Sequence, residues 1–488
     1  MTAELARVGG PIACAGLALL FVGRGRRERL AGLALAVVGA AALVVYLAPH
    51  GHRPVLAAAA VVGLVGAAAL AAVFRRWPWL IALAALACTP ARIPVSVGST
   101  DANLLVPLYG VVAGAVLLLG FELLFDRNAV RSRELGQLAW PLALLVAWSG
   151  LSLAWSDDLH QGAINLLFFF VPFGLLALVL ARLPWRRLWL QALYVELTAM
   201  ALVFAAVGVY QYATRDVFWN PKVIVGNAYA PFYRVNSVFW DPSIYGRFLV
   251  VAIVASLVLA LLSRNRRVAL YAGLAICATW VGLLFSFSQS SFAALIVGTV
   301  VASFFVWRWR AVAALGLVAA VILSVGFSAG PIRSQLLHKS SAGLNNATSG
   351  RTSLIANGIR IALHHPVAGV GLGGFKRAYA DRLHLHGEDP KKAASHNTPV
   401  TVAAETGLPG LALLVWLFVV ALKTGLSGIR RTLTGRARLV FVLALAAIAV
   451  HSLFYNALFE DPMFWGMLAF IASGAAVLER QRKRQAPA

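Results

Sequence analysis

The chain has 488 residues, of which 60% are hydrophobic and only 12% are charged, and its formal net charge is +24. A water-soluble protein carries about twice that share of charged residues, and its surface could not cover so much apolar side chain. The composition therefore excludes a soluble globular class and predicts an integral membrane protein.

Apolar segments of about 18 or more residues, the length that crosses roughly 30 Å of hydrocarbon, recur along the chain. Clear examples are residues 30–48, 55–74, 104–125 and 441–459. We expect helices, because a helix satisfies its own backbone hydrogen bonds inside lipid. The first apolar stretch lacks a preceding basic region and a convincing cleavage site, so we expect a span there rather than a signal peptide.

Positive charge is concentrated in the short connections between these segments. Eight connections hold 26 of the 42 lysines and arginines: residues 24–29, 75–76, 126–134, 182–187, 263–267, 307–310, 423–438 and 479–484. The positive-inside rule places such connections in the cytoplasm, so the charge indicates a membrane topology and no nucleic-acid partner. The alternation predicts an all-α polytopic protein of about fifteen spans, with the N-terminus outside and the C-terminus in the cytoplasm.

The same pattern divides the chain into four parts. Residues 1–77 hold three N-terminal spans, and residues 78–329 form the first part of the core, with an outward loop at 214–242. A large extracytoplasmic loop at 330–398 lies between the twelfth and thirteenth spans. Residues 399–488 hold the last spans and a basic tail.

The large outward loop carries most of the polar chemistry that the spans do not explain. It holds nine lysines and arginines against three carboxylates. Long loops escape the positive-inside rule, so the topology stands, but the charge favours anionic lipid head groups or a phosphorylated lipid substrate as partners. A solvated loop beside anionic lipid is the simpler alternative.

The sequence gives little support for a metal or a disulfide. The three cysteines fall in or near apolar segments and no Cys-x-x-Cys occurs, so we expect small buried side chains. The histidine pair at 384 and 386 has no clear carboxylate partner, and no outward loop contains Asp-x-Asp. We therefore expect neither a metal nor another cofactor.

Local order inside the large loop is predicted from caps and glycines. Residues 348–366 begin with Thr and Ser, continue with apolar residues at helical spacing and stop at a proline, which predicts a short amphipathic helix with Arg351 in its first turn. Four glycines in VAGVGLGGF (367–375) predict a tight turn that either shapes the backbone or approaches a ligand closely. Residues 375–385 are expected to form a second short helix.

These residues resemble a known family. The string HHPVAGVGLGGF (364–375), a variable stretch and then SHNTPVTVAAETGLPGLALL (395–414) are similar to the signature region of the membrane glycosyltransferases of the O-antigen ligase and polymerase type. Upstream, residues 91–108, YRVNSVFWDPSIYGRFL (233–249) and SGRTSL (349–354) also resemble that family. The resemblance covers roughly residues 78–478 and implies a twelve-helix core of the GT-C-like type with three additional N-terminal helices.

The resemblance also implies a chemistry. Members of the family transfer a glycan from a polyprenyl diphosphate donor to an acceptor hydroxyl at the outer face of the plasma membrane, with inversion and without a metal. By position, the family's diphosphate-binding arginines correspond to Arg234 and Arg351, and its catalytic histidine to His396. A guanidinium binds phosphate oxygens with two donors at once, and a neutral imidazole suits a base. The alternatives are surface or lipid-anchoring arginines and a histidine that anchors the next span.

Further polar residues near these three are candidates for support. Asn397 is expected to form a hydrogen bond either with the backbone or with the acceptor. Glu405 lies within an apolar run and is therefore expected to have a buried partner. Asp241 and Arg247 flank the start of another span and are expected to pair with the site or with each other. The glycines of the turn, including Gly371 and Gly373, are expected to form turns rather than to bind ligand.

One position departs from the pattern of the family. Gln289 stands where the family often has an arginine, so the donor is held differently here or that position is dispensable.

Three functions remain possible from the sequence. The leading function is a ligase that attaches a preassembled glycan to a lipid or glycan acceptor. A repeat-unit polymerase of the same family differs only in its acceptor. A non-enzymatic lipid or glycan transporter would be expected to carry ionisable residues along its spans, and these spans carry few.

Overall fold

The computed structural model describes residues 2–48, 53–97, 100–126, 134–229, 232–310, 316, 351–384, 395–427, 429 and 433–485. The first half of the chain contains α1 (Thr2–Val22), α2 (Arg26–Leu47), α3 (Arg53–Arg76), α4 (Leu80–Ala87), β1 (Ile93–Val97), β2 (Thr100–Leu104), α5 (Val106–Phe125), α6 (Ala139–Ser152), α7 (Leu159–Asn165), α8 (Val171–Ala181) and α9 (Arg187–Thr214). The second half contains α10 (Pro221–Tyr229), α11 (Pro242–Leu262), α12 (Arg266–Ser286), α13 (Gln289–Trp307), α17 (Arg351–His364), α18 (Phe375–Arg382), α19 (Thr398–Leu426), α20 (Leu433–Ser452) and α21 (Pro462–Gln485).

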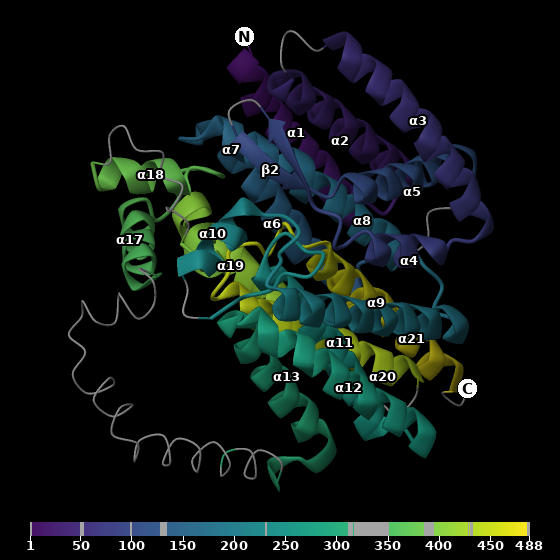
Figure 1. Ribbon diagram of the computed structural model, residues 1–488. Coiled ribbons are helices and arrows are strands. Elements are labelled where there is room, and N and C mark those ends of the chain that lie inside the picture. The colour runs from purple at the N-terminus through teal and green to yellow at the C-terminus, as the bar shows by residue number, and fades with distance from the viewer. Residues whose placement is uncertain are drawn as a thin grey trace.

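Within these described ranges, ten helices are long and apolar enough to cross a membrane, and two shorter apolar helices accompany them. The expectation of a polytopic helical membrane protein is therefore confirmed. The expected total of fifteen spans is not tested, because most of residues 311–350 lie outside the described residues. Figure 1 shows α1, α2, α3 and α5 packed on one side of the bundle, with α17 and α18 standing on another side next to α19.

The segment after residue 78 differs from the expected full-length span. It forms α4, whose eight residues rise about 12 Å, well short of the hydrocarbon thickness. An antiparallel hairpin then follows, with Ile93 paired to Leu104 and Val97 to Thr100. The resemblance did not imply these strands, so the structure adds a small β-element to the all-α class.

The predicted boundaries of two later elements also shift. The span expected at 441–459 is α20, which begins at Leu433 and ends at Ser452, so the boundaries expected there were wrong. Residues beyond Ser452 turn back across the end of the bundle, where the Leu453 carbonyl accepts a hydrogen bond from the Asn397 side chain at 3.0 Å. The outward loop expected at 214–242 contains the additional helix α10.

Helix α1 lies between α2 and α6 and is therefore part of the core. Small residues allow the backbones to approach closely: a Cβ on Gly16 would lie 2.3 Å from the Ala36 nitrogen, and one on Gly150 would lie 2.3 Å from the Cβ of Cys14. Close packing of small residues is a main source of helix association in membranes. The first N-terminal helix is thus inserted among core helices rather than appended to them.

At one end of the bundle, three connections that the sequence predicts to be cytoplasmic contact one another. Arg29 binds Glu134 with two short hydrogen bonds of 2.5 and 2.6 Å, and Arg182 bridges Glu134 and Glu122 at 3.0 and 2.7 Å. Arg29 and Glu134 are almost fully buried, and each charge has a partner, as burial of ions requires. Three of the predicted inner connections therefore meet at the same end of the protein.

At the opposite end, segments that the sequence predicts to face outward contact one another. Arg92 binds Glu460 at 3.2 Å, and the Trp155 indole donates to the Ala368 carbonyl at 3.1 Å. His160 contacts the Val97 carbonyl at 3.0 Å. Every candidate site residue of the sequence analysis lies on a segment attached to this end.

Candidate functional site

The glycine turn between α17 and α18 is held by contacts with the chain's own backbone. Gly369, Gly371 and Gly373 all have positive φ angles, of 66°, 83° and 83°. A Cβ on Gly371 would lie 2.2 Å from the Cα of Ser156, and one on Gly373 would lie 2.4 Å from the nitrogen of Gly162. These glycines are needed because the turn packs directly against backbone, which agrees with the expectation of turn formation.

The turn also pairs with a break in α19. Pro409 has no N–H, so it leaves the carbonyl of Glu405 without a helical partner. The Gly371 N–H donates to that carbonyl at 2.9 Å, and the Val370 N–H donates to the Ala404 carbonyl at 2.9 Å. Gly407, with φ 70°, provides the non-helical residue that opens the break. The turn thus completes the hydrogen bonding of a broken membrane helix.

The side chain of Glu405 lies beneath this turn and is 8% exposed. Its Oε1 accepts the N–H of Phe375, the first residue of α18, at 3.4 Å, and the backbone of Gly373 also approaches it. The expected buried partner of Glu405 is therefore the backbone of the turn. Glu405 connects the start of α18 to α19.

His396 lies directly before α19 in an unusual backbone conformation. Its φ is 52°, in the left-handed region that non-glycine residues seldom occupy. The Ser395 hydroxyl holds this geometry, because it accepts the Asn397 N–H at 3.1 Å and lies 2.8 Å from the Asn397 carbonyl and 2.5 Å from the Thr401 hydroxyl. Strained backbone held by its surroundings is concentrated at functional sites.

Asn397 is the N-cap of α19. Its Oδ1 accepts the Val400 N–H at 3.0 Å, and its Nδ2 donates to Leu453. Both halves of the amide are therefore used in bonds to backbone. This arrangement matches the supporting alternative in the sequence analysis rather than acceptor contact.

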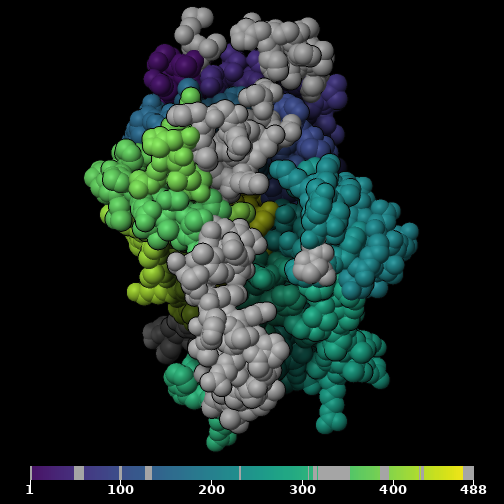
Figure 2. Space-filling model, turned by 60° about the vertical axis from the view of Figure 1, so that its left-hand side comes forward, coloured from purple at the N-terminus to yellow at the C-terminus, as the bar shows by residue number. Residues whose placement is uncertain are grey.

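Helix α17 covers Arg351–His364, within the range 348–366 where a short helix was predicted, and residues 348–350 lie outside the described part of the chain. The Arg351 side chain lies outside the described residues. Further along α17, a Cβ on Gly358 would lie 2.6 Å from a methyl carbon of Val400, so α17 packs on the first turn of α19. Figure 2 shows α17 and α18 as one green lobe on the flank of the molecule.

Arg234 lies before α11, in the loop that the sequence predicts to face outward. Its backbone is fixed by Asn227, which accepts the Arg234 N–H at 3.0 Å and donates to its carbonyl at 2.9 Å. The Arg234 Nε donates to the carbonyl of Ser286 at 3.2 Å, at the junction of α12 and α13. The guanidinium is therefore next to the start of α13.

The start of α13 holds a group of buried serines. The Ser288 hydroxyl lies 3.1 Å from that of Ser290 and 2.8 Å from that of Ser291, and Ser288 caps the helix. Gln289, which stands where the family often has an arginine, is the first residue of this helix. Arg234 therefore provides a cation near the position where the family's arginine is replaced.

Asp241 and Arg247 do not pair with each other. Asp241 caps α11 and accepts the Ser243 N–H at 2.7 Å, whereas Arg247 forms a buried ion pair of 3.0 Å with Asp461. Their expected pairing with one another was wrong, because the cap position uses Asp241 and a later carboxylate lies closer to Arg247. His451 completes this contact between α11 and α20, with its Nε2 3.1 Å from the Ser243 carbonyl.

Asp157 lies at the edge of the glycine turn, where its N–H donates to the Val370 carbonyl at 3.1 Å and its carbonyl accepts from Arg377 at 2.8 Å. Burial raises the pKa of the Asp157 carboxyl. The cationic form of His365 opposes this rise in pKa, Asp381 adds to it, and Arg377 opposes it. The outer edge of the turn is therefore a mixed-charge surface rather than a purely cationic one.

Hydrogen bonds join the start of α19, the end of α20 and the start of α11 at one end of the bundle. His396 and Asn397 are joined to the end of α20 through Leu453, and α20 is joined to α11 through His451 and Ser243. The described residues contain no group of three or more His, Cys, Asp or Glu side chains that could hold a metal ion. Of the histidine pair singled out in the sequence, His386 lies outside the described part of the chain.

Sequence patterns did not single out Asp461, Arg92 or the serines at the start of α13. Asp461 could have been found, because an Asp directly before a proline and an apolar run is a helix N-cap signal, and its Oδ1 accepts the Met463 N–H at 3.0 Å. No local sequence pattern indicates that the same carboxylate also forms an ion pair with Arg247.

The fold defines a multi-pass helical membrane protein, and the candidate residues lie at the end of the bundle that the sequence predicts to face outward. A family model described as O-antigen ligase matches residues 272–415, a segment that runs from α12 to the middle of α19. The matched segment is therefore similar to the O-antigen ligase family, in line with the resemblance of residues 364–375 and 395–414. It includes Gln289, Arg351, the glycine turn, His396 and Glu405, whereas Arg234, Asp241 and Arg247 lie before it. A search of curated proteins found no match.

Proposed function

We propose that the protein transfers a glycan from a polyprenyl diphosphate to an acceptor hydroxyl at the outer face of the plasma membrane. The family match supports a ligase-type membrane enzyme, and the large basic loop suits an anionic lipid donor. The polar end that carries the site is proposed to face outward, with the C-terminus in the cytoplasm.

In the proposed reaction, a ring nitrogen of His396 removes the proton of the acceptor hydroxyl. The acceptor oxygen then forms a bond to the anomeric carbon of the donor sugar as the bond from that carbon to the diphosphate oxygen breaks. Attack from the face opposite the leaving group inverts the anomeric configuration. Arg234 and Arg351 stabilise the negative charge that develops on the departing polyprenyl diphosphate.

One observation carries this proposal: the left-handed backbone of His396, held by Ser395 and Asn397 at the start of α19. A base must be held in register with its substrate, and a fixed backbone contributes to that precision. The glycine turn and Glu405 attach the α17–α18 lobe to the same helix, and α17 begins with Arg351.

The test uses the full-length protein in nanodiscs, with a polyprenyl-diphosphate-linked glycan and separate acceptor lipids and glycans. His396→Ala should lower kcat by about 10²- to 10⁴-fold, the usual contribution of a general base. Arg234→Ala and Arg351→Ala should each lower kcat/KM by about 10²- to 10³-fold, as loss of an anion-stabilising donor does.

Matched controls separate these effects from general damage. His364→Ala removes an exposed histidine from the end of α17, and Arg360→Ala removes an exposed arginine from the same helix, so both should retain transfer. Full activity of His396→Ala at equal expression would remove His396 as the base. A chelator should leave the rate unchanged. The acceptor that reacts distinguishes a ligase from a repeat-unit polymerase.

A further inference from the structure

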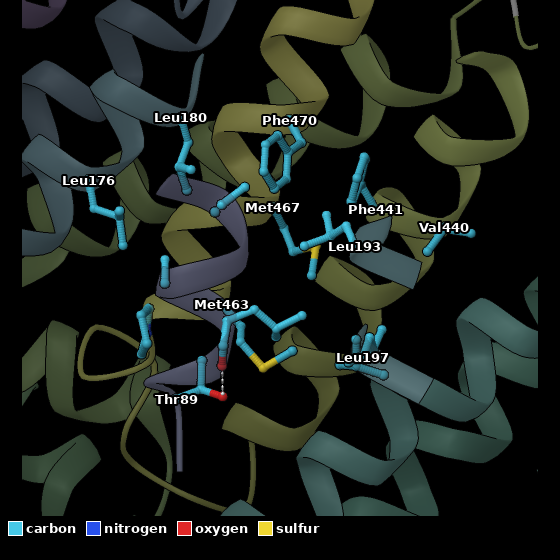
Figure 3. Close-up of a pocket in the computed structure, with 16 residues that line it drawn as sticks. Thr89, Leu176, Leu180, Leu193, Leu197, Val440, Phe441, Met463, Met467 and Phe470 are labelled. Carbon is cyan, nitrogen blue, oxygen red and sulfur yellow. Dashed lines mark hydrogen bonds between the residues drawn. The ribbon is translucent and has the colours of Figure 1, made fainter. Parts of the chain in front are cut away.

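The two sides of α9 border spaces of very different size. Figure 3 shows Leu193 and Leu197 of α9 lining a small apolar space inside the bundle, together with Met467 and Phe470. That space holds about 80 Å³, which admits a few atoms and no lipid chain. Another side of α9 borders a groove of about 630 Å³ that α12 shares, and this volume is within the usual range of ligand sites.

The groove forms because α9 and α12 are in contact at one level and apart at another. A Cβ on Gly282 would lie 2.7 Å from the Cβ of Ala205, so the two backbones approach closely there. The residues that line the groove precede this contact in both helices, within 194–202 of α9 and 268–278 of α12. The two helices therefore run parallel and separate toward their starts, where they leave a wedge-shaped opening.

The lining of the groove is mostly apolar, and its rims are exposed. The buried Ala272 and Ala275 leave it deep, because their side chains are small. Val195 and Leu274 also line it, and they are 62% and 58% exposed. The lining part of α12 rises about 15 Å, which is half of the hydrocarbon thickness. The groove therefore has the length of a hydrocarbon chain that belongs to one leaflet.

Four exposed arginines lie where these two helices begin. Arg186 and Arg187 are at the start of α9, and Arg266 and Arg267 are at the start of α12. Among the described residues, no carboxylate forms an ion pair with any of them. The N-terminal ends of the two helices add partial positive charge. An anion at the mouth of the groove therefore meets four cations that no described carboxylate neutralises.

This distribution of charge favours an anionic lipid over a second copy of the chain. All eight connections that the sequence predicts on this side have a net positive charge. A second copy in the same orientation would therefore bring like charge against the four arginines, which costs free energy. A lipid phosphate instead accepts two hydrogen bonds at once from a guanidinium, while its hydrocarbon chain covers the apolar walls.

We propose that the groove between α9 and α12 binds an anionic phospholipid of the leaflet in which both helices begin. The phosphate pairs with arginines at the starts of the two helices, and one acyl chain fills the wedge as far as the contact of Ala205 with Gly282. By the topology that the sequence predicts, this leaflet is the cytoplasmic one. His396 does not line the groove, so the lipid site does not depend on the proposed function.

The experiment uses the full-length protein in phosphatidylcholine nanodiscs with a small fraction of phosphatidylglycerol that carries a diazirine on its acyl chain. Ultraviolet cross-linking followed by peptide mass spectrometry should label the peptides of α9 and α12 about tenfold more than those of α3 and α5. Phosphatidylcholine with the same diazirine should label α9 and α12 about tenfold less than phosphatidylglycerol does, because it lacks the net negative charge. Equal labelling of α9 and α12 by the two lipids would overturn the site.

A variant without the four arginines tests the contact with the head group. Glutamine in place of all four should reduce labelling by phosphatidylglycerol to the level of phosphatidylcholine. The matched control replaces by glutamine four other exposed arginines of the predicted inner connections: Arg24, Arg27, Arg75 and Arg76. The control changes the net charge by the same amount and should label α9 and α12 like the wild type. Equal losses of labelling in both variants would show a general attraction to positive charge and overturn the site.

A variant that fills the groove tests the position of the acyl chain. Ala199 and Ala278 line the groove and are exposed, so leucine at both positions occupies its space. Labelling of α9 and α12 should fall about tenfold, because the new side chains displace buried methylene groups of the lipid. Leucine at the exposed Ala68 of α3 and Ala113 of α5 is the control and should keep the labelling. Unchanged labelling of the groove variant, or a wild-type dimer that this variant dissociates in native mass spectrometry, would overturn the lipid site.

Discussion

The N–H of Gly371 donates to the carbonyl of Glu405 at 2.9 Å, and Pro409 is the reason that this carbonyl is free to accept. A loop outside the spans and a helix within them therefore share backbone hydrogen bonds. This pairing attaches the α17–α18 lobe to the helix that begins next to His396.

Replacement of Gly371 by alanine should disrupt that pairing. The residue has φ 83°, and the new Cβ would lie 2.2 Å from the Cα of Ser156. The left-handed conformation alone costs a residue other than glycine about 1–2 kcal/mol, and relief of the clash adds to it. The free energy of unfolding, measured by titration with dodecyl sulfate in mixed micelles, should fall by more than that amount. Gly273→Ala, in an open helical position, should match or exceed the wild type; equal stability of both variants would contradict the close approach.

Glu405 should tolerate an amide better than an apolar side chain. Glu405→Gln keeps an oxygen that accepts the Phe375 N–H, whereas Glu405→Leu leaves that buried donor unsatisfied at a cost of about 1–3 kcal/mol. Backbone hydrogen exchange should therefore rise over the first turn of α18 in the leucine variant and stay near the wild-type level in the glutamine variant. Equal exchange in both variants would show that Glu405 does not hold the turn.

The ion pair between Arg29 and Glu134 should matter far more than an exposed one. Arg29→Ala leaves a carboxylate that is 8% exposed with Arg182 as its remaining partner among the described residues, so a loss of about 3–5 kcal/mol is expected. The pair of Arg7 and Glu4, on the surface at 3.8 Å, is the control, and Arg7→Ala should change the unfolding free energy by less than about 1 kcal/mol. Similar losses of unfolding free energy in the two variants would show that the contribution of an ion pair does not depend on its burial.

Ser395→Ala should affect turnover more than stability. The change removes the hydroxyl that accepts the Asn397 N–H and releases the backbone of His396. A base displaced by about 1 Å can lose on the order of 10²-fold in rate, so kcat should fall while the KM for the donor changes little. Ser427→Ala removes a serine hydroxyl from the opposite end of α19 and is expected to keep the wild-type kcat. A normal kcat in Ser395→Ala would show that catalysis does not depend on the strained backbone conformation of His396.

Sequence patterns predicted the features that depend on neighbours in the chain. Helical spacing of apolar residues and a proline stop predicted a helix within 348–366, where α17 lies, and the end of the loop expected at 330–398 matches the start of α19 at Thr398. The break in α19 was not predicted, because Gly407 and Pro409 open it only when the glycine turn supplies the missing donors. The ion pair of Arg247 with Asp461 could not be predicted either, since it depends on how two distant spans pack.

The position of α1 between α2 and α6, together with the bond from Arg29 to Glu134, limits how the chain can be shortened. The resemblance to the family suggests a core that starts near residue 78, but a protein cut there would lose Arg29, one of the two arginines that bind Glu134, and expose the face of α6 that α1 covers. Helices α1 and α2 therefore form a wall of the bundle, and a protein shortened to residue 78 should be less stable than the full chain.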